Sequence, residues 1–327
     1  MKQYDKILIL DYGSQYTQLI ARRVRELKVF SKILPYDTSI EKIKKESPKA
    51  IILSGGPMSV YDSNSYQFNK NILSLDIPIL GICYGMQLLM HHFGANVESS
   101  SLREYGSTKI KIMNSSKLFK NINQTTKVWM SHGDAISSFD DKWHTIAESD
   151  NNILASIQHK ERELYGVQFH PEVLHTIEGD KILDNFLFEI ADCDPSWTSE
   201  NFIEDTLDFI KKTAGESNVI CGISGGVDSS VMGALINKAI GAQAKFIFVN
   251  HGMLRKNEEV QVMESLKKGL SMDIEYVDAS DLFLDNLKDI KDPEEKRKII
   301  GKLFIDTFEE TSKKFENIDF LAQGTLY

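Results

Sequence analysis

Apolar runs of strand length alternate with amphipathic runs along most of this 327-residue chain, and this alternation restricts its fold more than any other feature. In the first part of the chain we expect strands at residues 6–10, 30–34, 50–53 and 78–82, and helices at residues 15–28, 39–46 and 85–93. Strands that alternate with helices are typical of a parallel sheet covered by helices. The sequence therefore predicts an α/β domain here.

The pattern changes after Gly106. Short strand-like runs follow at residues 109–113, 127–130, 153–158 and 164–169. Because no helix separates most of these runs, they predict an antiparallel part of the same sheet, closed by a helix at residues 180–190. Residues 192–198 include Pro195 and show little periodicity, so we place a domain boundary there.

The alternation restarts in the second half. Strands are expected at residues 218–223, 244–249, 273–277 and 319–322, and helices at residues 199–212, 231–240 and 258–270 and from residues 280 and 292 onward. We therefore expect an α/β protein of two domains, residues 1–192 and 199–327, joined by a linker at residues 193–198.

The amino-acid composition excludes several classes of function. The chain is 42% hydrophobic and 26% charged, as ordinary soluble proteins are, and its net charge of -9 argues against a nucleic-acid partner, which lysine and arginine excess would bind. Its apolar runs are shorter than the roughly 20 residues of a membrane helix. The sparse cysteines Cys83, Cys193 and Cys221 give no disulfide framework. We expect a cytoplasmic protein with small-molecule substrates.

A glycine- and serine-rich loop joins the first strand of the second half to the next helix. It comprises Ser224, Gly225, Gly226, Val227, Asp228, Ser229 and Ser230. Two glycines alone would indicate an ordinary turn. The full string predicts a phosphate site, because converging N–H groups, hydroxyls and a helix N-terminus suit a polyanion. It lacks the Gly-Lys-Ser/Thr of a Walker A loop, and Asp228 beside phosphates implies a magnesium ion between them.

Cys83 stands between an expected strand and an expected helix, in the string Gly-Ile-Cys-Tyr-Gly-Met-Gln. A tight turn with small neighbours projects a nucleophile from a strand end, and the N-terminus of the next helix favours a thiolate. A lone cysteine at a strand end is more commonly a buried structural residue. Partners elsewhere in the chain must decide between these interpretations.

Two further segments supply such partners. His170 and Glu172 follow a strand in Gly-Val-Gln-Phe-His-Pro-Glu. A histidine can carry a proton between a thiol and a leaving amine, while a carboxylate fixes its tautomer. Gly55 and Gly56 end another strand, and their N–H groups, with the amide of Tyr84, can receive a developing oxyanion.

These three segments resemble the signature strings of class I, triad-type glutamine amidotransferases, over about residues 5–190. The resemblance implies a mixed sheet flanked by helices. It also implies that Cys83 attacks the side-chain amide of glutamine, that His170 protonates departing ammonia, and that water releases glutamate from a thioester, with Glu172 completing the triad. The residues implied in glutamine or oxyanion binding are Gly55, Gly56, Tyr84, Gln87, Ser131 and His132.

The loop at residues 224–230 resembles the pyrophosphate-binding loop of the ATP pyrophosphatase family, whose members cleave ATP between the α and β phosphates to adenylate a substrate. This resemblance implies a parallel sheet of the adenine nucleotide alpha hydrolase type. It implies ATP and Mg²⁺ as cofactors, Asp228 as a magnesium ligand, and Val249 as a further ATP-binding residue.

The order of the two domains resembles one subgroup, the GMP synthetases. Strings at residues 11–16, 130–134, 249–258, 296–301 and 321–327 also match this subgroup. The resemblance implies a glutamine-dependent ligase of purine biosynthesis with glutamine, ATP and xanthosine monophosphate (XMP) as substrates. Ammonia from glutamine would displace AMP from adenylated XMP to give GMP, after release of pyrophosphate.

Two departures from the subgroup stand out. Asn250 occupies a position where members usually carry aspartate, which removes the carboxylate that a role there would need. The chain also stops at Tyr327, where members continue with the rest of the pyrophosphatase fold and a domain through which they homodimerise. We therefore expect residues 199–327 to be the N-terminal part of an ATP pyrophosphatase domain, without the dimerisation domain.

Two other functions remain open from the sequence. The chain can be a free-standing glutaminase that supplies ammonia to a separate synthetase chain. It can also be a remnant that binds ATP without turnover, in which case exposed apolar surface at the incomplete edge is expected.

Overall fold

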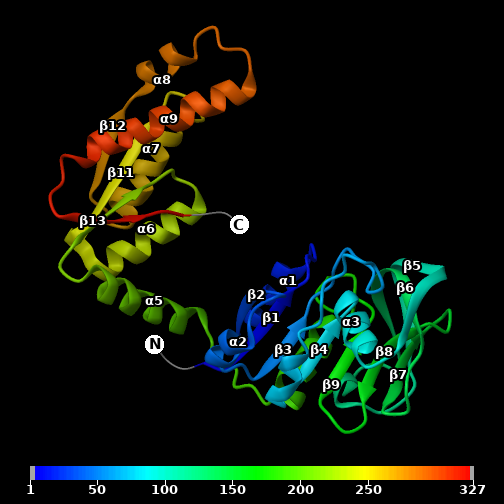
Figure 1. The fold of residues 1–327 in the computed structure, drawn as a ribbon. Helices are drawn as coiled ribbons and strands as arrows, with labels where there is room; N and C mark the ends of the chain where they lie inside the picture. Colours follow the sequence, from blue (N-terminus) through cyan, green and yellow to red (C-terminus); the bar gives the residue numbers. More distant parts are fainter. Residues whose placement is uncertain (1–3, 325–327) are drawn as a thin grey trace. The chain divides into compact units, whose positions relative to one another are not determined.

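The structure is a computed structural model that describes residues 4–324. These residues form two compact units, residues 4–198 and residues 199–324. Figure 1 shows their elements along the chain. Residues 1–3 of the first expected domain, and the last three residues of the string at 321–327, lie outside the described residues.

The first unit is built on one mixed sheet. Within residues 4–198 the strand order is β2-β1-β3-β4-β9-β8-β7-β5-β6. The parallel strands are β1 (Lys6–Asp11), β2 (Phe30–Pro35), β3 (Ala50–Leu53), β4 (Ile79–Ile82) and β9 (Leu164–Val167). Loops at the carboxyl ends of β3, β4 and β9 therefore meet at one edge of the sheet, the usual place for a site in an α/β fold.

The rest of this sheet is antiparallel. Its strands are β5 (Asn96–Ile112), β6 (Thr125–Ser138), β7 (Trp143–Ser149) and β8 (Leu154–His159). β9 joins the two parts, because it runs parallel to β4 and antiparallel to β8. An antiparallel bridge between Met130 and Phe169 also brings β6 beside the chain that follows β9.

Helices bury both faces of the parallel strands. They are α1 (Thr17–Glu26), α2 (Ile40–Glu46), α3 (Tyr84–His92) and α4 (Gly179–Asp184), with the 3₁₀ segments η1 (Lys70–Leu75) and η2 (Lys117–Phe119) and the π-helical segment η3 (Asn185–Ile190). In β1, Ile7 and Ile9 join the cluster that includes α1 and α4, whereas Leu8 and Leu10 join the one that includes α2 and α3. Burial on both faces explains the unbroken apolar string of this strand.

The second unit contains a parallel sheet with the order β12-β11-β10-β13 within residues 199–324. Its strands are β10 (Asn218–Gly222), β11 (Ala244–Asn250), β12 (Ile274–Asp278) and β13 (Ile318–Ala322). Its helices are α5 (Ser199–Ala214), α6 (Val227–Ile240), α7 (Glu258–Met263), α8 (Ser280–Leu287) and α9 (Pro293–Ser312), with the short segments η4 (Gly241–Gln243) and η5 (Glu264–Gly269).

Side chains of β11 show how this sheet is covered. Phe246 and Phe248 pack in a cluster with α5, α6 and α7, while Ile247 and Val249 pack in a second cluster with α8 and α9. Both faces of the strand are therefore buried, as in the first unit.

The predicted α/β class is confirmed: a mixed sheet flanked by helices comes first and a parallel sheet follows. β7 was not predicted, because its pairing with β8 shifts register near Ala147 and this breaks the alternation of buried and exposed residues. The antiparallel part also begins at Asn96, earlier than the predicted change after Gly106.

Three helix predictions also need correction. α6 begins at Val227, not at residue 231, so four residues of the predicted phosphate loop form the first turn of the helix. The helices predicted at residues 180–190 and 258–270 each change to a π-helical segment over their second half, η3 and η5.

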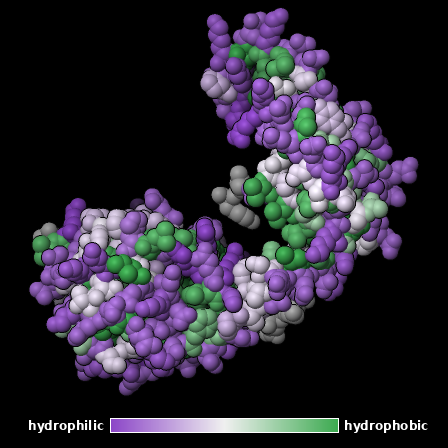
Figure 2. Space-filling model, turned by 180° about the vertical axis from the view of Figure 1, so that it is seen from behind, coloured by the Kyte–Doolittle hydropathy of each residue, from purple (hydrophilic) through white to green (hydrophobic). Residues whose placement is uncertain are grey.

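The surface is mostly polar on the face drawn in Figure 2, where apolar residues form separate areas between hydrophilic ones. Among residues 4–324, no helix combines the length and the apolar character that a membrane span requires.

Candidate functional site

Cys83 occupies the sharp turn between β4 and α3. Its φ of 51° and ψ of -108° lie in a region that residues with a side chain rarely adopt, so the backbone is strained there. The N–H of Cys83 donates to the Val167 carbonyl on β9 at 2.8 Å, which ties the turn to the sheet. Cys83 is only 7% exposed, so the sulfur lies in a nearly closed site at the carboxyl edge.

Two glycines make this turn possible. A Cβ on Gly85 would lie 2.4 Å from the carbonyl oxygen of Leu53, and a Cβ on Gly81 would lie 2.6 Å from the amide nitrogen of Met86. Neither contact is sterically allowed. β3, β4 and α3 therefore approach one another so closely around Cys83 that only glycine fits at these two positions.

His170 and Glu172 lie just beyond the end of β9. Nδ1 of His170 is 2.8 Å from Oε1 of Glu172, which is fully buried. The backbone of His170 is held at both ends, because its N–H donates to the Trp129 carbonyl at 3.0 Å and its carbonyl accepts from Thr176 Oγ1 at 2.6 Å. The carboxylate therefore fixes the ring so that Nδ1 carries a proton.

Burial alone would lower the pKa of His170, but hydrogen bonds with Cys83 and Glu172 outweigh it and raise the pKa to about 10. The ring is therefore an imidazolium at neutral pH, with a carboxylate on one side and the sulfur on the other. Tyr16 packs edge-on against it, with ring centroids 5.0 Å apart. The structure thus brings Cys83, His170 and Glu172 from two separate segments into one array.

The glycine loop after β3 passes beside this array. A Cβ on Gly55 would lie 3.4 Å from Cε1 of His170, and a Cβ on Gly56 would lie 2.8 Å from the carbonyl oxygen of Tyr12. Tyr84 is the first residue of α3, so its N–H has no acceptor within the helix. The predicted oxyanion donors Gly55, Gly56 and Tyr84 therefore border the same site as the sulfur.

Asp134 fixes this loop to β6, a contact that sequence reasoning missed. Ser59 Oγ donates to one carboxylate oxygen of Asp134 at 2.5 Å, and the Tyr61 hydroxyl donates to the other at 2.9 Å. Asp134 stood within one of the matched strings, but only the fold shows that its partners lie on the glycine loop.

The two predicted residues on β6 differ in their contacts. The carbonyl oxygen of Ser131 lies 3.6 Å from the Cys83 sulfur. The side chain of His132 is buried and faces Glu104 directly across the strand pair, with Nε2 and Oε2 3.3 Å apart and Nδ1 2.9 Å from the Asp134 carbonyl. Burial raises the pKa of Glu104, but hydrogen bonds with His132 and two polar neighbours outweigh it and lower the pKa.

Gln87, also predicted, connects this region to the nucleophile. Its Nε2 donates to the Asp134 carbonyl at 3.2 Å and to Oε1 of Gln168 at 3.0 Å. Nε2 of Gln168 in turn donates to the Cys83 sulfur at 3.5 Å. Sequence reasoning missed Gln168, although it lies in the strand predicted at residues 164–169, two residues before His170, and alternate residues of a strand face the same way.

The predicted phosphate loop is a compact turn between β10 and α6. Gly225 has a φ of 80°, and a Cβ there would lie 2.4 Å from a methyl group of α7. Oγ of Ser224 lies 3.0 Å from Oγ of Ser229, and Ser230 Oγ donates to the Gly226 carbonyl at 2.8 Å. These contacts hold the loop in shape, and the first amides of α6 have no acceptor within the helix, as a bound anion would require.

Asp228 and Val249 flank this loop. Asp228 is exposed in the first turn of α6. Val249 is 4% exposed on β11 and its side chain packs in the core, so only its backbone is available to a ligand. Within the described chain, no three His, Cys, Asp or Glu side chains come together as a metal site. A magnesium ion at Asp228 would therefore need ligands from a nucleotide.

Asn250 is not isolated from carboxylates. Its side-chain nitrogen donates to the Glu259 carboxylate and lies 3.0 Å from the Tyr276 hydroxyl, while its oxygen accepts from the N–H of Gly252 at 2.9 Å. Glu259 on α7 therefore supplies a negative charge beside the position where the resemblance implies aspartate.

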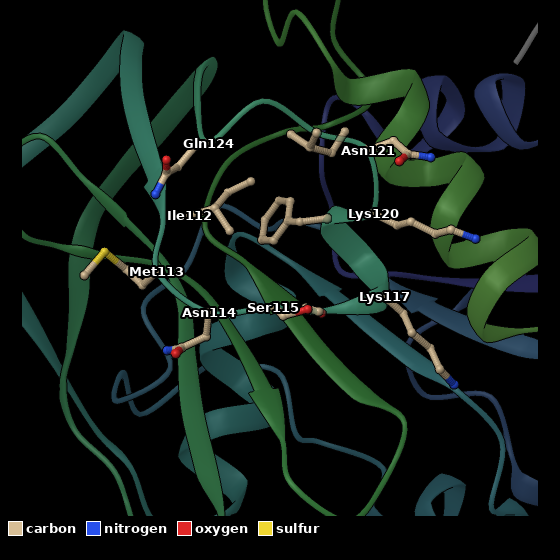
Figure 3. A pocket seen from close by; sticks show the side chains of 11 residues that line it. Ile112, Met113, Asn114, Ser115, Lys117, Lys120, Asn121 and Gln124 are labelled. Carbon is tan, nitrogen blue, oxygen red and sulfur yellow. The ribbon is translucent and has the colours of Figure 1, made fainter.

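A surface pocket of about 600 Å³ lies away from all of these residues, between the end of β5 and η2. Figure 3 shows Lys117 and Lys120 extending away from Ile112. Their ammonium groups pair with Glu163 at 2.9 Å and Glu189 at 2.8 Å, so they offer no free positive charge to a ligand.

Comparison with known proteins agrees with the geometry of the first unit. Residues 8–190 match the family model described as glutamine amidotransferase class-I. The chain belongs to this family. In this class-I glutamine amidotransferase, residues 198–300 also match the model described as NAD synthase.

Curated relatives match along the whole chain. GMP synthase [glutamine-hydrolyzing] of Brachyspira hyodysenteriae is 52% identical over 99% of this amidotransferase, and that of Bacillus cytotoxicus is 49% identical over 100% of it. The chain spans 63% and 64% of the length of these two relatives. The crystal structure of a Thermoplasma acidophilum protein described as a GMP synthase subunit is 32% identical, with a TM-score of 0.51, over 63% of this chain and all of that one.

Proposed function

We propose that this chain hydrolyses glutamine at Cys83 and directs the ammonia to the amination of ATP-activated XMP, giving GMP. The observation that carries the proposal is the array of a strained cysteine, a buried imidazolium and a buried carboxylate at one sheet edge. The names of the curated relatives support the choice of acceptor.

We assign the amidotransferase domain to residues 1–192, the linker to residues 193–198, and part of an ATP pyrophosphatase domain to residues 199–327. The match of residues 198–300 to the NAD synthase model supports the last assignment. The free cysteines fit a reducing compartment, so we place the reaction in the cytoplasm.

The glutaminase reaction follows from the array. The Cys83 thiolate attacks the side-chain carbonyl carbon of glutamine, a C–S bond forms, and the carbonyl electron pair moves to oxygen. As the carbonyl reforms, the C–N bond breaks and His170 transfers its proton to the departing nitrogen, which leaves as ammonia. Water then attacks the thioester while His170 takes its proton, and glutamate leaves as the C–S bond breaks. Glu172 stabilises the imidazolium in both of its appearances, before ammonia leaves and after water is deprotonated.

The surrounding groups bind the substrate. N–H groups of Gly55, Gly56 and Tyr84 receive the negative charge that develops on oxygen. Both N–H groups of the Gln87 side chain donate hydrogen bonds within the protein, so its carbonyl oxygen is left to accept a hydrogen bond from glutamine. Ser131 and His132 contribute through their backbone, because the His132 side chain is engaged by Glu104.

The second domain activates the acceptor. Amides of the loop from Ser224 to Ser230, at the N-terminus of α6, hold the pyrophosphate part of ATP, and the Val249 backbone lies at the end of the neighbouring strand. Asp228 would hold a magnesium ion together with the nucleotide, and that ion would supply positive charge to the leaving pyrophosphate.

The test is to measure glutamate and GMP release by this 327-residue chain with glutamine, Mg-ATP and XMP. Glutamate with GMP is expected if both domains work as proposed. Glutamate without GMP would refute the synthetase half and leave a free-standing glutaminase. Release of neither product would refute both halves for this chain.

Cys83→Ala assigns the activity to the site. It should abolish glutamate release and spare GMP formation from added ammonium, because the second domain needs only ammonia. Cys193→Ala is the matched control, since Cys193 is equally buried at 7% exposure but its sulfur faces the Ala191 carbonyl. Equal loss of glutamine- and ammonium-dependent activity in Cys83→Ala would contradict the division of labour.

A further inference from the structure

Two buried glutamine side chains connect the nucleophile to the rest of the sheet. Gln168 is 1% exposed and Gln87 is 3% exposed, and their amides are joined by a hydrogen bond of 3.0 Å. At one end of this pair Gln87 contacts the Asp134 carbonyl, and at the other Gln168 contacts the Cys83 sulfur at 3.5 Å. Buried polar groups of this kind must be satisfied, so their arrangement is strongly determined.

The orientation of both amides follows from the first link. A backbone carbonyl only accepts hydrogen bonds, so the group of Gln87 that faces Asp134 must be its NH₂. The second N–H of the same nitrogen reaches Gln168, which must therefore present its oxygen to Gln87. The NH₂ of Gln168 is then left to face the sulfur. No flip of either amide would satisfy all three contacts.

We propose that Gln168 is a further catalytic residue, which donates a hydrogen bond to the Cys83 sulfur and stabilises its thiolate, with Gln87 as the positioning residue that fixes the donor. The inference rests on the proposed glutaminase reaction, because it assigns the donor to that nucleophile. A donor aimed at sulfur favours the anion over the thiol.

Other charged groups around the sulfur are few. His170, with Glu172 behind it, faces the sulfur from the chain after β9. His132 and Glu104 form their own pair on β6 and β5, beyond the Ser131 carbonyl. The contribution of Gln168 is therefore separable, because a neutral amide can be removed while both histidine–glutamate contacts remain.

The test is the rate of Cys83 alkylation by iodoacetamide as a function of pH, with the modified peptide identified by mass spectrometry. Burial raises the pKa of both Cys193 and Cys221 to about 12, so these thiols react slowly. Gln168→Met keeps the volume of the side chain and removes the donor. The pH of half-maximal alkylation should rise by about one pH unit, as expected for the loss of a hydrogen bond to a charged group.

Two further variants sharpen the result. Gln168→Glu still accepts a hydrogen bond from Gln87 but turns an acceptor toward the sulfur. The pH of half-maximal alkylation should therefore rise further than in Gln168→Met. This second variant keeps the test decisive if Gln168→Met does not fold. Gln158→Met is the matched control: it removes an amide of the same kind on β8, whose partner is Ser116, and should leave the profile unchanged.

The possible outcomes separate this inference from the function on which it rests. A shift in both Gln168 variants, with none in Gln158→Met, supports the donor. Profiles that superimpose on the wild type would overturn the role of Gln168 and leave the glutaminase proposal intact. A wild-type Cys83 that alkylates like an ordinary exposed thiol, with no glutamate release, would overturn the proposed function itself.

Discussion

Replacing Glu172 by glutamine removes one charge from the centre of the candidate triad with almost no change in shape. Glu172 is fully buried and its Oε1 lies 2.8 Å from Nδ1 of His170. Its other oxygen has no hydrogen-bond partner among the described residues. The carboxylate therefore acts on the imidazolium through a single charged hydrogen bond, which Glu172→Gln converts to a neutral one.

The magnitude follows from that one bond. A hydrogen bond to a charged group is worth about 1.5–3 kcal/mol, so its loss lowers the pKa of His170 by about 1 to 2. In the wild type this pKa is raised from 6.5 to about 10, so the stability contributed by the protonated ring is fully present below pH 6.5 and is lost as pH rises through 10. In the variant the contribution at pH 7 should be smaller by about 1.5–3 kcal/mol and should disappear at a lower pH.

Urea denaturation followed by tryptophan fluorescence measures the free energy of unfolding of the first structural unit. The three tryptophans of the chain, Trp129, Trp143 and Trp197, all lie in the first unit, so the signal reports its unfolding alone. The free energy of unfolding is compared between wild type and Glu172→Gln at pH 7 and pH 10.5. Any change in the burial cost of the side chain is the same at both pH values and cancels in the comparison.

The pH dependence of the difference decides the result. The free energy of unfolding of Glu172→Gln should be lower than that of the wild type at pH 7 and equal to it at pH 10.5. A deficit of equal size at both pH values would refute the conclusion that Glu172 holds His170 protonated. Glu98→Gln is the control, because it removes the same charge from an exposed residue whose partner is the amide of Asn96.

Three other substitutions test contacts elsewhere. Gly179→Ala should destabilise the first unit by about 1–3 kcal/mol and reduce glutamate release, because its Cβ would lie 2.0 Å from the Pro171 carbonyl oxygen, between the two triad residues after β9. Gly301→Ala should instead stabilise α9 by about 0.5–1 kcal/mol in thermal melts followed by circular dichroism, since, apart from the adjacent turns of α9 itself, no described residue has an atom within 4 Å of a Cβ placed there. Glu104→Gln replaces the carboxylate that faces His132 and should cost about 1.5–3 kcal/mol at pH 7 in urea denaturation, as expected for the loss of a hydrogen bond to a charged group. The difference in stability between this variant and the wild type should be smaller in acid. The stability that a carboxylate of lowered pKa contributes to the wild type is lost as pH falls.

The fold was largely predictable where both faces of a strand are buried. The string of β1 is apolar at every position from Ile7 to Leu10, and such strings identify parallel strands regardless of their partners. β7 escaped prediction because its identity depends on pairing: a register shift near Ala147 interrupts the alternation that would have revealed it. The start of α6 at Val227 was also hidden, since glycines and serines before it resemble a loop.

Residues of the site could be predicted only where the neighbours that determine their role lie next to them in the sequence. Cys83 and His170 stand in short strings whose neighbours shape the backbone, so each string could be interpreted alone. Gln168 and Glu104 act through residues far along the chain, Gln87 and His132, and these pairings arise from the order of strands in the sheet. The spacing of Gln168 and His170 was a signal for Gln168 itself, but no spacing in the sequence encodes the pairing of Gln168 with Gln87 or of Glu104 with His132.

The two candidate sites share one backbone arrangement, a strand–turn–helix junction, but each stabilises a different anion. In each unit a strand of the parallel sheet ends, the chain turns sharply, and a helix begins with its unpaired N–H groups facing the turn: Cys83 precedes α3 and Gly226 precedes α6. At Cys83 the anion is part of the protein, and the turn is strained, nearly buried and contacted by a histidine and a glutamine. At Gly226 the anion must come from solution, so the turn is exposed and its hydroxyls hold only the loop itself. The difference in burial between two otherwise equivalent junctions therefore indicates which one carries a nucleophile and which one receives a ligand.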